Sequence, residues 1–519
     1  MADNHEIELK PLGFFKRTNP PVFLLSVAVM AVFILSSTFF TESARDFFGH
    51  LQFLITHYFS WVFTFATTVI LLAMLYLLFS PIGKLRLGGP DERPEFSRVT
   101  WFAMLFSAGM GIGLVFWSIA EPISHYMNPP SGPGETLEAA RQAMRITFFH
   151  WGFHAWAVYC MMGLALAYFA FRLGLPLTIR SVFYPVLGNR IYGPWGHAID
   201  IFAVVSTMFG VSTSLGLGAM QVNSGLNFIT GWEESTFHQV LLIAGITAVA
   251  TTSVVLGLVK GISRLSHFNL WLSAGFLLFV LAAGPTVFLF GNFFETFADY
   301  LPQVFTLGIW SESFPDEDWR ASWTTFYWAW WVAWSPFVGM FIARVSRGRT
   351  IREFVFWVLI APCLATFVWL SVFGGTALHQ EMYDGAAISQ AVAANVSSAL
   401  FITLQEIPFQ FVSVLVAVVV IITYFVTSSD SGSLVIDIIT AGGLQDPPKN
   451  QRIFWAITEG MIAIVLLVFG GLKALQTAAI ASGFPFSFIL LGMCYCLFKA
   501  LRKEHAKSRA QPVEIREVS

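Results

Sequence analysis

The sequence predicts an all-α polytopic membrane protein with twelve transmembrane helices, and three observations support this prediction. Of the 519 residues, 56% are hydrophobic and 12% are charged, whereas about a quarter of the residues of a soluble domain are charged. Apolar runs of about 20 residues, the length that spans a bilayer as a helix, recur from Pro20 almost to Phe498. Basic residues gather in alternate loops between these runs. The runs are too long and too continuously apolar for the strands of a membrane β-barrel.

The predicted spans are the longest apolar runs of the chain. They cover residues 20–40, 57–79, 101–121, 146–171, 198–222, 239–258, 269–290, 323–343, 353–375, 410–427, 453–472 and 475–498. The longest polar stretches between them are 291–322 and 378–409. No water-soluble domain fits in loops of this length, so we expect function to reside within the membrane.

The two signs of charge are sorted between alternate loops. Lysine and arginine precede the first span and follow the second, fourth, sixth, eighth, tenth and twelfth, as in Lys16, Arg86, Arg180, Arg349 and Lys503. The other loops are mostly acidic or bare, and Arg141 and Arg145 are among the exceptions. By the positive-inside rule, the basic loops and both termini are expected in the cytoplasm.

The predicted spans fall into two blocks of five, 101–290 and 323–498. Each block begins with an aromatic residue after a polar loop, Trp101 and Trp323. Because five is odd, the second block enters the membrane from the opposite side, which is the arrangement of an inverted repeat with its binding site near mid-membrane.

Three further segments complete the predicted organisation. They are an N-terminal tail with two accessory helices (1–100), an external amphipathic connecting segment (291–322) and a short cytoplasmic tail (499–519). The apolar residues of the connecting segment recur at helical spacing, which is typical of an interfacial helix or of a subunit contact.

Small and hydroxyl residues predict helix breaks at 107–113, 212–218 and 427–433. Glycines at alternate positions of the first segment weaken a helix and free carbonyls for a cation or a ligand. Hydroxyls and carbonyls are hard oxygen ligands that suit sodium. Close helix packing through small residues is an equal alternative for the first segment, and helix-end capping for the last.

Aromatic clusters are the strongest chemical signal. Four tryptophans, Trp328, Trp330, Trp331 and Trp334, fall within seven residues of the eighth span. Trp151, Trp156 and Tyr159 belong to the fourth span. A cage of aromatic faces attracts a cation such as trimethylammonium. An interfacial belt and aromatic core packing are the alternatives.

Few ionisable side chains lie within the predicted spans. Glu121 and Asp200 fall near predicted helix ends, where capping or water exposure would suffice, whereas Glu459 lies deep and could hold a proton. His150 and His154 with Glu121 are the one candidate set for a membrane hydrolase, but no HExxH motif accompanies them, so no enzyme is expected. Cys160, Cys363, Cys494 and Cys496 are expected as buried residues without disulfides.

Five segments together resemble the betaine/choline/carnitine transporter family. They are GMGIGLVFWSIAEPISHY at 109–126, HWGFHAWAVY at 150–159, the aromatic run through 326–354, FGGTAL at 373–378 and FVTSSDSGS at 425–433. The resemblance covers nearly the whole chain. It implies twelve spans, a LeuT-like 5+5 inverted repeat over spans three to twelve, alternating access, a homotrimer and a place in the bacterial inner membrane with its lipid.

The resemblance also implies two kinds of site. The substrate site would comprise Trp151, Trp156, Tyr159, Trp330, Trp331 and Trp334 with Met110, Gly111 and Gly113. A sodium ion would be held by the backbones of Ser107, Met110 and Tyr424 and the side chains of Thr427 and Ser428. A second sodium site would use Thr207 and Phe337, but Val211 stands where the family has another threonine.

The function implied by this resemblance is sodium-driven uptake of glycine betaine for osmoprotection, with no cofactor beyond the coupling ion and no nucleic-acid partner. Choline carriers of the family often have an aspartate at the position of Gly113, so its absence favours a zwitterion. The alternatives are choline, carnitine, ectoine or a sulfonium osmolyte as substrate, and a proton as coupling ion.

Overall fold

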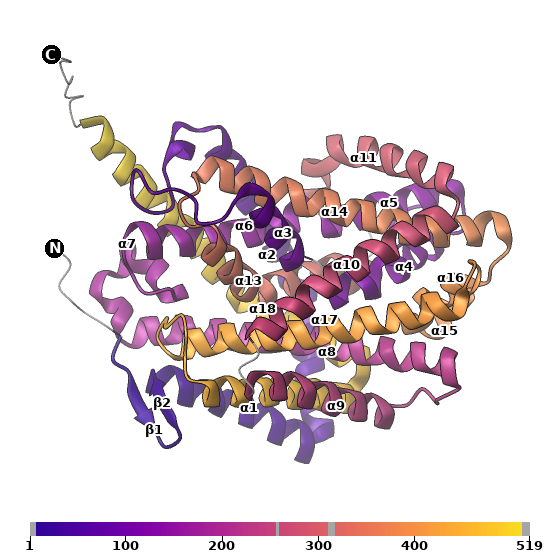
Figure 1. Cartoon of the computed structure of the whole chain (residues 1–519), viewed down its shortest axis with the longest axis horizontal. Coiled ribbons are helices and arrows are strands. Elements are labelled where there is room, and N and C mark those ends of the chain that lie inside the picture. The colour runs from indigo at the N-terminus through magenta and orange to yellow at the C-terminus, as the bar shows by residue number, and fades with distance from the viewer. Residues whose placement is uncertain (1–6, 110, 256–258, 310–316, 511–519) are drawn as a thin grey trace.

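The computed structural model describes residues 7–109, 111–255, 259–309 and 317–510, and Figure 1 shows that they form a bundle of helices with one small hairpin. The hairpin pairs strands β1 (Lys10–Leu12) and β2 (Phe15–Thr18) in antiparallel register. The remaining elements of the described chain are helical, which confirms an all-helical polytopic membrane protein.

The first half of the bundle is built from long helices joined by short turns. In chain order these are α1 (Pro20–Phe39), α2 (Thr41–Phe79), η1 (Pro81–Lys84), α3 (Arg98–Gly109), α4 (Ile112–Met127), α5 (Leu137–Trp151), α6 (Phe153–Ala167), η2 (Tyr168–Arg172), η3 (Ile179–Phe183), α7 (Tyr184–Leu187), η4 (Gly188–Tyr192), α8 (Pro194–Thr230), α9 (Thr236–Val255) and α10 (Val259–Ala283).

The second half begins with a helix in the predicted connecting segment. Its elements are α11 (Thr286–Gly308), α12 (Glu317–Arg320), η5 (Ala321–Thr325), α13 (Phe326–Val345), α14 (Ile351–His379), η6 (Gln380–Asp384), α15 (Ile388–Ala394), η7 (Val396–Ser398), α16 (Ala399–Gln405), α17 (Gln410–Thr440) and α18 (Lys449–Ala510). In α11, Tyr300 and Val304 are buried, whereas Phe294 and Leu301 are exposed.

Eight helices of the described chain are long and apolar enough to cross a membrane by length and composition. Of the other predicted spans, the third is interrupted between α3 and α4, the sixth coincides with α9, the eighth coincides with α13, and the last two merge in α18. The merged case is α18, whose backbone leaves helical geometry at Gly470 and Gly471. The φ of +58° at Gly471 is a conformation that favours glycine. The two last predicted spans therefore meet at a bend within one continuous element.

Only the first of the three predicted helix breaks is present. The chain leaves α3 at Gly109 and enters α4 at Ile112, and Met110 between them lies outside the described residues. The predicted breaks at 212–218 and 427–433 are wrong, because α8 and α17 run through them without interruption.

The small residues of α8 serve close packing instead of a break. The Ser212 hydroxyl donates to the Glu459 carbonyl of α18 at 3.0 Å, and the Thr213 hydroxyl reaches the Leu475 carbonyl at 3.0 Å. A Cβ on Gly216 would come within 2.6 Å of Leu475. Small residues let helix backbones approach closely, so here they join α8 to α18 and leave the helix intact.

The two predicted five-span blocks interleave in space. Helix α8 packs against α17 and α18, α13 packs against α6, α8 and α18, and α4 packs against α5 and α14. Residues contributed by α4 to α6 therefore meet residues of α13 inside the bundle.

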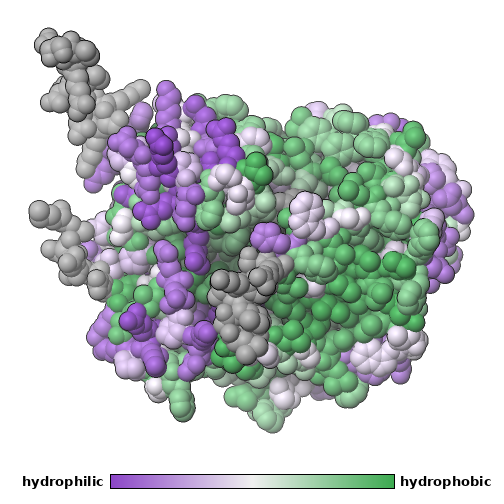
Figure 2. All heavy atoms as spheres, in the orientation of Figure 1, coloured by the Kyte–Doolittle hydropathy of each residue, from purple (hydrophilic) through white to green (hydrophobic). Residues whose placement is uncertain are grey.

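The surface has the pattern of a membrane protein. On the face shown in Figure 2, hydrophilic residues gather toward the two ends of the long axis, and a broad hydrophobic area lies between them. The β1–β2 hairpin and the last turns of α18 lie at the same end, on the left of Figure 1. Both ends of the described chain are thus on one side of the hydrophobic area.

Candidate functional site

Two glycines beside the break between α3 and α4 differ in their surroundings: there is space for a side chain at Gly111 but not at Gly113. Gly111 has an extended backbone, and a Cβ built on it would meet nothing within 4 Å. A Cβ on Gly113 would lie 2.2 Å from Cη2 of Trp330. Glycine is therefore required at position 113 for the Trp330 indole to occupy its place, a reason that the sequence alone did not suggest.

Five of the six predicted aromatic residues form one continuous cluster, which we call the aromatic box: Trp151, Trp156, Tyr159, Trp330 and Trp331. The Trp151 ring meets Trp331 edge to face at a centroid distance of 4.9 Å and Trp330 at 6.3 Å. Trp330 and Trp331 stack at 5.6 Å, Tyr159 meets Trp331 at 5.7 Å, and Trp156 meets Tyr159 at 5.4 Å. Aromatic rings from α5, α6 and α13 are thus in direct contact with one another.

Trp334, the sixth predicted residue, faces a different neighbour. Its ring packs on Phe337 at 5.1 Å, and its indole N–H donates to the Gly210 carbonyl of α8 at 2.7 Å. Trp331, Trp334 and Phe337 stand at i, i+3 and i+6 of α13, and all three are half-buried. They therefore share a stripe of α13 that stays partly accessible although the helix lies inside the bundle.

Some polar atoms of the aromatic box have a hydrogen-bond partner and others have none. The Trp331 indole donates to the His150 carbonyl at 2.9 Å, and the Trp151 indole donates to Oε2 of Glu121 at 2.7 Å. Within the described chain, the Trp330 indole N–H and the Tyr159 hydroxyl are buried without a partner. Buried donors of this kind are costly unless a ligand accepts from them.

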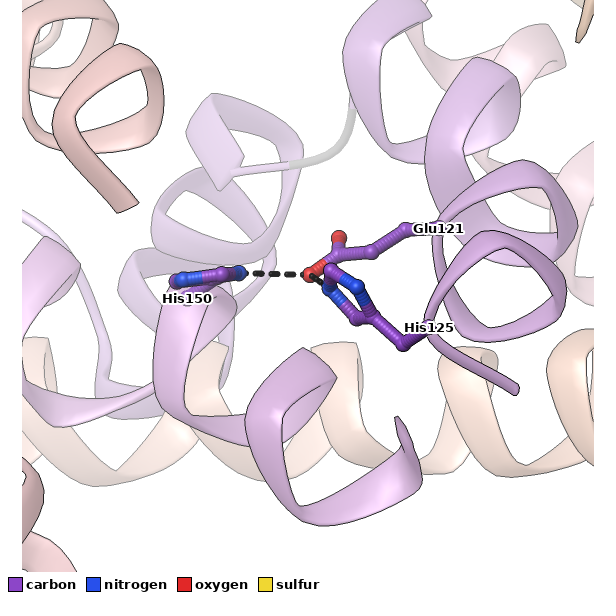
Figure 3. Close-up of side chains that lie close together, drawn as sticks. All are labelled: Glu121, His125 and His150. Carbon is purple, nitrogen blue, oxygen red and sulfur yellow. Dashed lines mark hydrogen bonds and ion pairs between the residues drawn. The ribbon is translucent and has the colours of Figure 1, made fainter. Parts of the chain in front are cut away.

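A carboxylate and two imidazoles adjoin the aromatic box through Trp151, and Figure 3 shows how the three side chains converge. Oε1 of Glu121 is 2.7 Å from Nδ1 of His150 and 3.3 Å from Nε2 of His125, and all three side chains are fully buried. Their ligating atoms lie within 4.8 Å of one another, and carboxylate and imidazole are ligands that zinc accepts. Because Glu121 is already within hydrogen-bond distance of both rings, the group is a hydrogen-bonded network as it stands.

This network corrects the expectation for Glu121. The residue does not cap a helix end in water but lies inside α4 with no exposure. His125 and Tyr327, which sequence reasoning did not select, are its partners. The i, i+4 spacing of Glu121 and His125 was the available signal. His154 packs against Phe149 and Trp328 and not in the network, so the candidate hydrolase set of Glu121, His150 and His154 is not assembled.

The predicted sodium ligands are only partly within the described residues. Met110 lies outside them, as does the side chain of Ser107. Thr427 and Ser428 share one turn of α17, where the Thr427 hydroxyl donates to the Thr423 carbonyl at 2.9 Å and keeps its lone pairs. The Tyr424 hydroxyl pairs with Ser273 of α10 at 3.1 Å, and the Tyr424 carbonyl accepts from the Thr427 hydroxyl at 3.2 Å.

The residues of the expected second sodium site offer few oxygens. The Thr207 hydroxyl donates to the Ala203 carbonyl of its own helix at 2.7 Å. Val211, one turn further along α8, is fully buried and brings only methyl groups. Phe337 lies on the half-buried stripe of α13 beside Trp334.

Comparison with known proteins identifies similar chains along almost the whole length. The profile of the BCCT family, the betaine/carnitine/choline family transporters, matches residues 21–506. A probable glycine betaine transporter of Desulfitobacterium hafniense is 45% identical over 497 residues, which cover 95% of this chain and 99% of the relative. A glycine betaine transporter of Bacillus subtilis is 44% identical over 93% of this chain and 94% of its own length. A glycine betaine/proline/choline/ectoine transporter of Vibrio parahaemolyticus is 46% identical over 93% of this chain and 87% of its own length.

Proposed function

Because the chain belongs to the BCCT family and is a transporter of the glycine betaine/choline type, we propose that it is a sodium-driven symporter of glycine betaine. The proposal includes uptake for osmoprotection by alternating access, in the bacterial inner membrane with both termini in the cytoplasm. It also includes twelve spans, a LeuT-like inverted repeat over spans three to twelve, and a homotrimer.

The aromatic box is the observation that supports a quaternary ammonium compound as the substrate. Trp151, Trp330 and Trp331 offer the faces and edges that attract a quaternary ammonium group, which cannot donate a strong hydrogen bond. The unpartnered N–H of Trp330 and O–H of Tyr159 are donors for a carboxylate. A molecule with a trimethylammonium head and a carboxylate satisfies both, and glycine betaine is the smallest compound of this kind.

The hydroxyl pair of α17 supports sodium as the coupling ion. Thr427 and Ser428 place two hard oxygens on one helical turn. The freed backbone beside the break between α3 and α4 supplies carbonyls of the same chemical type. Sodium prefers such uncharged oxygen ligands, whereas a proton would require a titratable group such as Glu459.

Uptake into proteoliposomes tests the proposal. Radiolabelled glycine betaine should accumulate when sodium is high outside and should fail to accumulate when gramicidin collapses the sodium gradient. A pH gradient without sodium should give no accumulation. Accumulation that follows the pH gradient alone would overturn sodium coupling and would favour the proton-driven alternative.

Competition between radiolabelled glycine betaine and unlabelled compounds identifies the preferred substrate. Unlabelled glycine betaine should displace the label at a lower concentration than choline, carnitine, ectoine or proline does. The range of compounds follows the broad substrate set in the name of the Vibrio parahaemolyticus relative. Stronger displacement by choline would contradict the assignment of a zwitterion.

A further inference from the structure

Glu121 joins three helices behind the aromatic box. Its carboxylate comes from α4, while Trp151 and His150 come from the end of α5 and Tyr327 from the start of α13. Oε2 accepts from the Trp151 indole at 2.7 Å and from the Tyr327 hydroxyl at 2.5 Å. Oε1 faces the two histidines, as Figure 3 shows.

These contacts use the full accepting capacity of an ionised carboxylate. Each oxygen has two partners, and the Trp151 indole is a donor that cannot accept. Hydrogen bonds to an ionised acceptor are shorter and about twice as strong as those between neutral groups. The short contacts on Oε2 agree with an ionised Glu121.

The charge of Glu121 has no arginine or lysine partner among the described residues, since its ion-pair contacts are with His125 and His150. Nε2 of His150 pairs with the Thr324 hydroxyl at 2.9 Å, and Nδ1 of His125 has no partner in the described chain. A protonated His125 would bury an N–H without an acceptor. Neutral imidazoles therefore fit best, and the network then carries one net negative charge.

This charge lies directly behind rings of the aromatic box. Trp151 meets Trp331 and Trp330 edge to face, and Tyr327 contacts Trp151 at 5.6 Å and Trp330 at 6.4 Å. An indole that donates to an anion gains electron density on its face, which strengthens its attraction for a cation. The carboxylate also fixes the orientation of both rings through their polar ends.

We propose that Glu121 is a positioning and specificity residue that holds Trp151 and Tyr327 in place and whose negative charge favours a cationic head group. The inference rests on the proposed transport of quaternary ammonium compounds. It revises the argument from Gly113: the site has an anion, but the anion lies behind the rings and not at position 113.

The variant Glu121→Gln tests this role in the purified full-length protein. Binding of glycine betaine and of choline is followed by tryptophan fluorescence. Loss of the carboxylate should weaken betaine binding roughly tenfold and choline binding by a clearly larger factor, because choline carries a net charge and betaine does not. Glu121→Asp, which keeps the charge on a shorter side chain, should bring the ratio of choline affinity to betaine affinity back from its value in Glu121→Gln toward that of the unmodified protein.

Two further variants serve as controls. Glu504→Gln changes another carboxylate that accepts a tyrosine hydroxyl, from Tyr168 at 2.6 Å, at the far end of α18, and it should bind both ligands as the unmodified protein does. Tyr327→Phe removes one donor but keeps the charge, so it should weaken both ligands by the same small factor.

Each outcome decides the proposal. A folded Glu121→Gln protein that binds both ligands normally, or that loses both equally, would overturn the role of the charge. If Glu121→Gln does not fold, an unequal loss of choline and betaine in Tyr327→Phe would overturn it instead. Failure of the unmodified protein to bind either ligand would overturn the proposed function and is distinct from both results.

Discussion

At the scale of single residues, the contact between Gly113 and Trp330 sets the shape of the aromatic box. The Trp330 ring occupies the space in which a Cβ at position 113 would lie, and Trp330 has 2% of its surface exposed. A buried indole has little room to move in a densely packed interior. The absence of a side chain at position 113 is therefore a steric requirement as well as a matter of charge.

The variant Gly113→Ala should consequently weaken glycine betaine binding about tenfold or more, because overpacking of this size costs about 1–3 kcal/mol and displaces Trp330. Binding is measured by tryptophan fluorescence. Gly275→Ala, at an exposed position of α10, provides the control, since a Cβ there meets nothing within 4 Å. Normal betaine affinity in Gly113→Ala would show that charge alone matters at this position.

Thr427 supports a second prediction at this scale. Removal of its hydroxyl in Thr427→Ala should raise the sodium concentration for half-maximal uptake roughly tenfold, as expected for loss of one oxygen ligand. The maximal rate at saturating sodium should change little. Ser433→Ala removes a hydroxyl of the same helix that bonds to the Asp430 carbonyl, and it should leave the sodium dependence unchanged. An unaltered sodium dependence in Thr427→Ala would argue against this sodium site.

At the scale of elements, hydropathy predicted the helices because lipid leaves the backbone no other way to satisfy its hydrogen bonds. Runs of small and hydroxyl residues correctly predicted the break between α3 and α4, but the same reasoning wrongly predicted breaks at 212–218 and 427–433. Glycine and serine serve a break or a close contact equally well, and the choice depends on the facing helix. For Gly216 that helix is α18, which contributes Leu475 from a distant part of the chain.

In the candidate site, too, residues that are distant in the sequence determine contacts that a single segment does not reveal. The aromatic residues could be selected because they are clustered in sequence, whereas Glu121 binds Trp151 and Tyr327 from segments 30 and 206 residues away. Spacing within one segment cannot reveal such partners. Asp200 is a further case: capping or water exposure near a helix end was expected, yet the residue is fully buried and accepts from Nε of Arg180 at 2.6 Å.

The Arg180–Asp200 pair joins η3 to the start of α8. Breaking it by Arg180→Ala should destabilise the protein by about 3–5 kcal/mol, because Asp200 would stay buried without its counter-charge. The readout is thermal unfolding in detergent. The exposed Arg98 pairs with Glu353, so Arg98→Ala serves as the control and should change stability by less than about 1 kcal/mol. Equal stability of the two variants would contradict the buried ion pair.

At the scale of the whole molecule, the bundle presents a hydrophobic area between two polar ends, with the β1–β2 hairpin and the end of α18 on one side (Figures 1 and 2). The four cysteines are buried, as expected, so a cysteine added at the surface can be labelled selectively. This allows the orientation in the membrane to be measured.

In intact cells, Asp384→Cys should react with a membrane-impermeant maleimide, whereas Gly13→Cys should react only after permeabilisation. Both positions are exposed, and they lie in segments assigned to opposite sides by the sorting of charges. Labelling of Gly13→Cys from outside would reverse the proposed orientation.

The central claim is that the aromatic box binds the substrate, and equilibrium binding of radiolabelled glycine betaine tests it most directly. The purified protein should bind the label saturably, and Trp331→Leu should reduce affinity by about tenfold or more, since a desolvated cation–π contact contributes about 2 kcal/mol. Trp195→Leu changes an exposed tryptophan at the start of α8 and should bind normally. Unchanged affinity in a folded Trp331→Leu protein would contradict the account.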